Sequence, residues 1–344
     1  MTTRSPTGVP APPATATRPR PVTTADDPGD PDLRVAVVVP CHDEAASITR
    51  VVIDFAAALP GAQIYVYDNA SSDQTSALAE QAGAIVYREP RKGKGNVTRR
   101  MFADVDADVY VMVDGDGTYD ASSSPKMLDL LLHDRLDMVV GTRQPVADDA
   151  NVYRKGHSTG NAAFSRALNA VLGGCFTDIF SGYRVMSKRF VKSFPIQSTG
   201  FEIETELSAH AVEVGAAYAE VPTAYGSRDD GSSSKLRTYR DGTRIMFTLI
   251  RLFEAMRPLQ FFAICFALLT AVAFALGIPV VNDYARTGLV LRFPTAILAM
   301  SVQIVAFLCL TSGVILKSVR RARQEARRLV YLQHRAPSSI DSRS

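Results

Sequence analysis

The sequence has few cysteines, and none of them lies in a pair that would bind zinc or form a redox centre. The 344 residues contain four cysteines, without a C-x-x-C pair or a His/Cys zinc spacing. We therefore expect neither a disulfide framework nor a zinc site, and a reducing, cytoplasmic setting suits the main domain.

The sequence also lacks an excess of charge and the common nucleotide-binding loops. A net charge of +3 gives no reason to expect a nucleic-acid partner. The absence of G-x-x-x-x-G-K-[ST] excludes a P-loop, and the absence of G-x-G-x-x-G argues against a dinucleotide site. Residues 1–32 have no apolar h-region, so we expect a disordered tail and not a signal peptide.

The chain is organised around residues 109–120, VYVMVDGDGTYD. Residues 109–113 form a β-branched apolar run, which is typical of a strand buried on both faces of a parallel sheet. The run ends in Asp114 and Asp116, at the place where open α/β sheets bind ligands. Oxygen ligands of this kind suit Mg²⁺ or Mn²⁺. For these residues alone, a polar turn made of Asp and Gly is the alternative interpretation.

The sequence around this stretch alternates between short apolar runs and helical patterns. This alternation predicts βαβαβαβ, an α/β fold with helices between parallel strands and polar residues at the strand ends, which makes a nucleotide crevice. The expected strands are residues 34–39, 63–67, 84–87, 109–113, 138–140 and 220–224, and the expected helices include 45–58, 77–81, 122–134 and 157–172.

A basic, glycine-rich loop at residues 88–96 precedes the helix that returns to the central strand. Arg88, Lys94 and the backbone N–H groups of this loop would meet a diphosphate. Asp68 ends the 63–67 strand and is placed for a ribose or base contact, with a solvated turn acid as the alternative.

Seven blocks between residue 34 and about residue 245 resemble the family 2 inverting glycosyltransferases with the GT-A fold. The branch that makes polyprenyl-phosphate sugars is the nearer match. Two blocks depart from the family pattern: HDE at 42–44 stands where Tyr-Asn-Glu is more common, and DNAS at 68–71 where Asp-Asp-Gly-Ser is usual. The seven blocks are VVVPCHDE, YDNASSDQT, RKGKGN, DGDGTY, DIFSGYR, GFEIE and RDDGSSSKL.

The resemblance implies roles for residues in every block. It implies that Asp114 and Asp116 hold Mg²⁺ or Mn²⁺ against the diphosphate, and that catalysis rests on Asp116, Arg143, Arg184 and Glu204. One alternative is that Arg184 and Glu204 form only a structural ion pair. Another is that Arg228 and Lys235 are solvated loop charges. The implied substrate-binding residues are Pro40, His42, Glu44, Asp68, Lys94, Asp114, Arg228, Ser234 and Lys235.

The C-terminal third predicts a membrane anchor. Residues 259–281 and 295–316 are uncharged and long enough to cross a bilayer, with a buried helical hairpin as the alternative. Residues 238–257 read as a basic amphipathic helix at the interface. The Lys and Arg residues between 317 and 328 predict a basic cytoplasmic tail over 318–344. The catalytic domain, residues 33–237, and both termini are then cytoplasmic.

The family resemblance implies an inverting glycosyltransferase, and the uncharged spans place it in the cytoplasmic membrane. We expect it to act in cell envelope glycan synthesis. It would move a sugar from a UDP- or GDP-sugar to undecaprenyl or dolichyl phosphate. Because a phosphate acceptor is already largely ionised near neutral pH, it needs positioning and no strong base.

Two alternatives to this function stay open, and so does a homo-oligomer. One is transfer to a sugar hydroxyl in glycan or polysaccharide synthesis, which usually comes with a Gln-x-x-Arg-Trp motif, whereas this chain has no Trp. The other is an inactive membrane scaffold that binds a nucleotide sugar, against which the intact Asp114/Asp116 pair argues.

Overall fold

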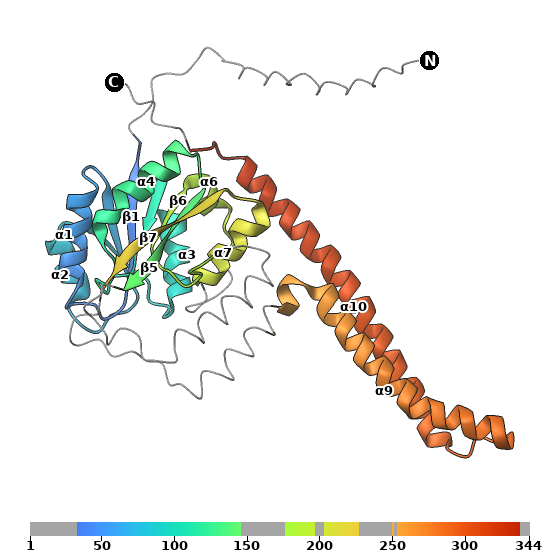
Figure 1. The fold of residues 1–344 in the computed structure, drawn as a ribbon. Coiled ribbons are helices and arrows are strands. Elements are labelled where there is room, and N and C mark those ends of the chain that lie inside the picture. Colours follow the sequence, from blue (N-terminus) through green and yellow to red (C-terminus); the bar gives the residue numbers. More distant parts are fainter. Residues whose placement is uncertain (1–32, 146–175, 197–202, 227–249, 251–252, 338–344) are drawn as a thin grey trace, which may run out of the picture. The chain divides into compact units, whose positions relative to one another are not determined.

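The computed structural model describes residues 33–145, 176–196, 203–226, 250 and 253–337 (Figure 1). Their centre is a seven-stranded sheet in the order β3-β2-β1-β4-β6-β5-β7. The apolar runs of the sequence form its middle, since β1 and β4 are buried along almost their whole length. The strands are β1 Val35–Cys41, β2 Gln63–Asp68, β3 Ile85–Arg88, β4 Val109–Met112, β5 Met138–Pro145, β6 Arg184–Ser187 and β7 Tyr218–Tyr225.

The sheet is mixed, whereas the sequence pattern predicted parallel strands. β1 is parallel to β2 and β4, and β5 is parallel to β7, as expected. The unexpected strand is β6, which runs antiparallel to both β4 and β5. Because Met112 pairs with Arg184, the residues just before β6 arrive at the carboxyl end of β4. The extra strand therefore brings the Ser-Gly-Tyr turn at 181–183 to the central acidic stretch.

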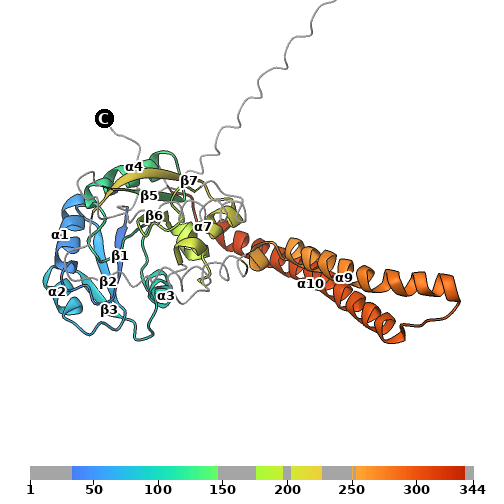
Figure 2. The same cartoon turned by 60° about the horizontal axis from the view of Figure 1, so that its bottom comes forward.

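Helices pack on the two faces of the sheet (Figures 1 and 2). Alternate residues of β1 and β4, among them Val38 and Met112, join one hydrophobic core with α3, α6 and α7. α1 and α4 contact each other and pack with the other face. The helices are α1 Ile48–Ala58, α2 Thr75–Gln81, α3 Lys94–Asp104, η1 Ala121–Ser123, α4 Ser124–His133, α6 Lys188–Ser193 and α7 Ile203–Val214. The helix expected at 157–172 lies outside the described residues.

Two long helices follow, α9 Pro258–Thr287 and α10 Phe293–Leu332, and they lie side by side in both views (Figures 1 and 2). Each is long and apolar enough to cross a membrane. Both outrun the expected spans of 259–281 and 295–316. α10 continues as helix through most of the segment expected to be a basic tail. Of the amphipathic helix expected at 238–257, only the last part is described.

The basic end of α10 packs on the catalytic domain. The Tyr331 hydroxyl donates to Asp137 Oδ2 over 2.6 Å, and Asp137 is fully buried. Glu213, in the last turn of α7, pairs with Arg320 over 3.3 Å and with Arg327. Residues 318–332, which were expected to belong to a basic tail, are helical, and their aromatic and cationic side chains have partners on the domain.

Candidate active site

The central acidic pair follows β4 directly. The Asp114 side chain is partly exposed, at 28%. Asp116 is 5% exposed, and its Oδ1 accepts hydrogen bonds from the Thr118 N–H and hydroxyl at 3.2 and 2.7 Å. The turn therefore fixes Asp116 and presents Asp114 at the end of the strand.

Lys94 joins Asp114 to a third carboxylate. Its Nζ donates to Asp114 Oδ1 over 2.5 Å and to Glu204 Oε1. Lys94 begins α3 and Glu204 lies in the first turn of α7, so three separate blocks of the sequence meet here. Burial alone would lower the pKa of Lys94, but the two carboxylates outweigh it, and the pKa is raised. The ammonium group therefore stays charged although its side chain is only 10% exposed.

The turn before β6 leaves just enough room for Asp114. A Cβ atom added to Gly182 would lie 2.5 Å from Asp114 Oδ2. The Gly182 N–H donates to the Tyr119 hydroxyl over 2.9 Å. Glycine is thus required here for a close approach of backbone to a carboxylate.

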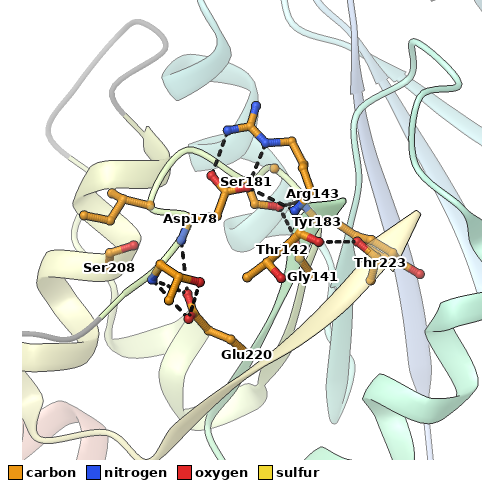
Figure 3. A network of polar contacts seen from close by, with 12 residues as sticks. Gly141, Thr142, Arg143, Asp178, Ser181, Tyr183, Ser208, Glu220 and Thr223 are labelled. Carbon is orange, nitrogen blue, oxygen red and sulfur yellow. Dashed lines mark hydrogen bonds and ion pairs between the residues drawn. The ribbon is translucent and has the colours of Figure 1, made fainter. Parts of the chain in front are cut away.

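Arg143, at the end of β5, is held by a network of its own (Figure 3). Its Nε and Nη2 donate to the two carboxylate oxygens of Asp178 over 2.8 and 2.7 Å. Glu220 of β7 accepts from the N–H groups of Thr177 and Asp178 and so fixes that carboxylate. Burial opposes the charge of Arg143, but the pairing with Asp178 dominates and its pKa is raised. The guanidinium also lies 5.6 Å from the ring centre of Tyr225.

Arg184 lies beneath the site. It is fully buried, and its Nε and Nη2 donate to the carbonyls of Ser181 and Ile179 over 3.0 and 2.8 Å. Nη2 also donates to Ser208 Oγ over 3.0 Å. Burial lowers the pKa of Arg184 to about 10, so it is still a cation near neutral pH. In this arrangement Arg184 holds the 179–183 turn, and its expected contact with a phosphate stays a prediction.

Asp68 likewise organises a loop. It is fully buried, and it accepts from Ser71 N–H and Ser76 Oγ at 2.8 and 2.5 Å and from Arg88 Nε at 3.3 Å. Burial would raise the pKa of Asp68, yet these donors lower it overall. The carboxylate thus fixes the turn after β2, and its expected contact with a ribose or base stays a prediction.

The other residues expected around a nucleoside lie at the carboxyl end of β1. Pro40 is buried in the strand opposite Tyr67. His42 is partly exposed, with its Nε2 3.5 Å from Asp43 Oδ2. The Glu44 N–H donates to Thr75 Oγ1 over 2.9 Å. Arg228, Ser234 and Lys235 lie outside the described residues.

Asn69 is a positioning residue that the sequence reasoning treated only as a departure from a pattern. Its amide nitrogen donates to the carbonyls of Glu89 and Arg91 over 3.0 and 2.7 Å, and its Oδ1 accepts from the Gly93 N–H over 2.6 Å. An amide supplies both the donors and the acceptor that this clamp needs, whereas a carboxylate supplies only acceptors. The basic loop that leads to Lys94 is thereby fixed.

The described residues contain no group of three or more His, Cys, Asp or Glu side chains that could hold a metal ion. A divalent ion at Asp114 and Asp116 would therefore take its other ligands from substrate and water, as Mg²⁺ commonly does beside phosphates. The carboxylate oxygens of Asp114 and Asp116 are the donor type that such an ion prefers.

Comparison with known proteins identifies the family to which this chain belongs. Residues 36–194 match the model of the glycosyl transferase family 2. Glycosyltransferase AglJ of Haloferax volcanii is 34% identical over 251 residues, which cover 73% of this chain and 82% of the relative. The chain belongs to glycosyl transferase family 2. It is a glycosyltransferase, and its mixed sheet is that of the GT-A fold.

Two further relatives and one solved structure extend the comparison. Protein RfbJ of Shigella flexneri is 58% identical over 125 residues, 36% of this chain and 96% of that protein. Undecaprenyl-phosphate mannosyltransferase of Micrococcus luteus is 26% identical over 216 residues, 58% of this chain and 87% of the relative. Glucosyl-3-phosphoglycerate synthase of Mycobacterium tuberculosis, solved with Mn²⁺ and UDP-glucose, shares the fold at a TM-score of 0.50 and 22% identity, over 65% of this chain and 80% of that one.

Proposed function

We propose that this family 2 glycosyltransferase moves a sugar from a nucleoside diphosphate sugar to a polyprenyl phosphate, with inversion. The observation that carries the proposal is the meeting of Asp114, Lys94 and Glu204 at the end of β4, in a chain that also has two helices long enough to cross a membrane. A relative named undecaprenyl-phosphate mannosyltransferase supports the lipid acceptor.

Asp114 and Asp116 would hold Mg²⁺ or Mn²⁺ against the diphosphate. When bound, the ion neutralises negative charge on the departing nucleotide. Lys94, fixed between two carboxylates, adds to this electrostatic stabilisation. Glu204 acts by positioning Lys94, and no strong general base is required of it.

The acceptor phosphate would be aligned behind the anomeric carbon. A phosphate monoester is largely ionised near neutral pH, because its second pKa is about 6. The protein therefore has to orient this nucleophile in line with the leaving diphosphate, which inverts the anomeric configuration. Arg143 suits this task because its partners fix the guanidinium before any substrate arrives.

The two apolar helices would place this chemistry at a membrane. We propose that α9 and α10 cross it as a hairpin, with the short connection after Gly288 outside. The cationic second half of α10, from Lys317 to Arg328, would then lie in the cytoplasm with the catalytic domain. The same arrangement brings the lipid acceptor to the side where nucleotide sugars are made available.

A transfer assay tests the proposal. Full-length protein in detergent is offered labelled UDP- and GDP-sugars, Mg²⁺ or Mn²⁺, and undecaprenyl phosphate. We expect label in the lipid fraction, reduced at least ~100-fold in Asp116→Ala because an electrostatic contact at the reacting diphosphate is lost. The matched control is Asp129→Asn, an exposed carboxylate on α4, which should transfer normally.

Nucleotide release without a lipid product would instead indicate a hydroxyl acceptor. Binding of the nucleotide sugar without any turnover would support an inactive scaffold. Either result contradicts the proposed reaction.

A further inference from the structure

A cationic cavity lies between the start of α9 and the basic part of α10. Its volume is ≈ 500 Å³, and it is lined by the start of α9 and by successive turns of α10. Four of its lining side chains are cations, and none of its lining residues is acidic. The cations are Arg257, Lys317, Arg320 and Arg321.

The spacing of residues on α10 builds this cavity. Gly313 lets the helices approach closely, since a Cβ there would lie 2.8 Å from the Phe262 Cβ. One turn further on, Lys317, Arg320, Arg321 and Gln324 follow at the i, i+3, i+4 and i+7 positions, which share one helix face. Close packing thus gives way to a wide polar opening within a single turn.

The positive charge of Lys317, Arg320 and Arg321 is only partly compensated. Arg321 pairs with the exposed Glu325 over 3.1 Å, and Arg320 Nη2 reaches Glu213 over 3.3 Å. The Nε of Arg320, however, is buried and has no hydrogen-bond partner among the described residues. Lys317 makes no ion pair in the described part of the chain. The first turn of α9 also lines the cavity, and the N-terminal end of a helix attracts anions.

We propose that this cavity binds the phosphate of a lipid headgroup. The proposal rests on the proposed membrane insertion, which puts the cytoplasmic end of the helix pair at headgroup height. The tetrahedral phosphate ester fits the chemistry of the site, because several convergent N–H donors and no carboxylate line it. The lipid tail would follow the apolar surfaces of α9 and α10.

This site is separate from the sugar-transfer site. Glu213, which holds Arg320, and Glu204, which holds Lys94, lie at opposite ends of α7. Nine residues of helix span roughly 13 Å at 1.5 Å per residue. A phosphate in the cavity is therefore not the phosphate in line with the sugar. It belongs either to an anionic phospholipid of the membrane or to a polyprenyl phosphate waiting outside the active site.

Native mass spectrometry of the full chain tests the site without any nucleotide sugar, so its outcome does not depend on the transfer reaction. The protein in neutral detergent is titrated with phosphatidylglycerol and, separately, with phosphatidylcholine. We expect tight retention of phosphatidylglycerol, weakened roughly tenfold or more in the double variant Lys317→Gln/Arg321→Gln, because each cation near a headgroup contributes measurably to binding.

The matched control is Arg323→Gln/Arg328→Gln, which removes two charges from the same helix outside the cavity. It should retain phosphatidylglycerol like the unchanged protein. Equal losses in both double variants would overturn the proposal in favour of diffuse attraction to the basic helix. Equal binding of both lipids would overturn it by showing that the cations do not recognise an anionic headgroup. If Lys317→Gln/Arg321→Gln does not fold, the single variant Lys317→Gln is used in its place.

A competition experiment identifies the source of the phosphate. Displacement of phosphatidylglycerol by a small excess of undecaprenyl phosphate assigns the cavity to the acceptor lipid. Retention of phosphatidylglycerol under that excess assigns it to a membrane phospholipid. If neither lipid binds Lys317→Gln/Arg321→Gln more weakly than it binds Arg323→Gln/Arg328→Gln, the proposal is contradicted.

Discussion

At the scale of single residues, two departures from the family pattern coincide with unusual backbone conformations. Asp43 and Ala70 both have φ of 56°, in the left-handed region that favours Gly and Asn. The more common family residues named for these two positions are Asn and Gly. Asp43 is compensated because its Oδ1 accepts from the Ser72 N–H over 2.7 Å. Ala70 has no side chain that could offer such compensation.

Ala70→Gly should therefore stabilise the protein. We expect a gain of about 0.5–1 kcal/mol in the free energy of unfolding, because relief of the left-handed strain exceeds the added entropy of glycine in the unfolded chain. Urea denaturation measures it. Ala57→Gly, at an exposed position in the last turn of α1, is the control of opposite sign and should cost up to ~1 kcal/mol. Destabilisation by Ala70→Gly would contradict this account of the turn.

His210 makes the stability of the domain depend on pH. It is 2% exposed among Phe190 and Phe194, and its Nε2 lies 3.0 Å from Ser193 Oγ. Burial, with the nearby charge of Arg327, lowers its pKa to about 3. Because the folded pKa is depressed, the unfolded state takes up the proton first as the pH falls. The stabilisation is complete above the ordinary histidine pKa of 6.5 and is lost progressively toward pH 3.

The stability of the unchanged protein should drop between about pH 7 and about pH 5, by roughly 2 kcal/mol from this histidine. His210→Gln does not titrate and should show a smaller drop. Thermal unfolding of both proteins at the two pH values gives the comparison. Parallel pH profiles would show that another group is responsible.

At the scale of secondary-structure elements, α10 links the apolar hairpin to the catalytic domain. Its last turns contact α6 and α7. Asp137 accepts hydrogen bonds from Tyr331 and Arg189, and Glu213 forms ion pairs with Arg320 and Arg327. Both acceptors are buried carboxylates, so each contact is worth more than an exposed ion pair. α10 is therefore held at two points, and one of them lies on α7, which carries Glu204 in its first turn.

Glu213→Gln should weaken this attachment. Two arginines lose their shared counter-charge at a mostly buried position, at a cost of about 2 kcal/mol. We expect a lower Tm in detergent and faster proteolysis of the last turns of α10. Glu325→Gln removes an exposed i,i+4 pair with Arg321 and is the control, with an effect below ~0.5 kcal/mol. Equal Tm values in the two variants would show that α10 does not depend on Glu213.

At the scale of the whole molecule, α10 runs without interruption from the apolar hairpin to the catalytic domain. The exposed surface of α9 and α10 is largely apolar in their middle sections, where Leu268, Phe274, Met300 and Leu308 are more than half exposed. A soluble protein rarely exposes so much contiguous apolar surface. A bilayer would cover it.

Topology labelling tests the proposed orientation. A cysteine at Leu289, in the connection between the helices, should react with an impermeant maleimide in intact cells, since this connection is proposed to face outward. A cysteine at Arg335, beyond α10, should react only after the membrane is opened. Labelling of Arg335→Cys but not Leu289→Cys in intact cells would reverse the orientation, and extraction of the protein by alkaline carbonate would exclude the spans.

Elements with a local pattern could be predicted from the sequence alone. Apolar runs and helical patterns predicted β1, β2, β4 and the helices between them, because strand and helix periodicities act over a few residues. The acidic pair at 114 and 116 and the two uncharged spans were found in the same way. The motif resemblance predicted the family and the GT-A fold, and both were confirmed.

The contacts between side chains of distant sequence blocks could be read only from the tertiary structure. The four residues of β6 carry too weak a pattern to be predicted, yet their antiparallel pairing brings Gly182 to Asp114. The same long-range packing places Lys94 between Asp114 and Glu204 and buries Arg184 and Asp68 as supports of their loops. Burial and pairing depend on contacts across the whole chain, and a motif records which residue is present without recording what covers it.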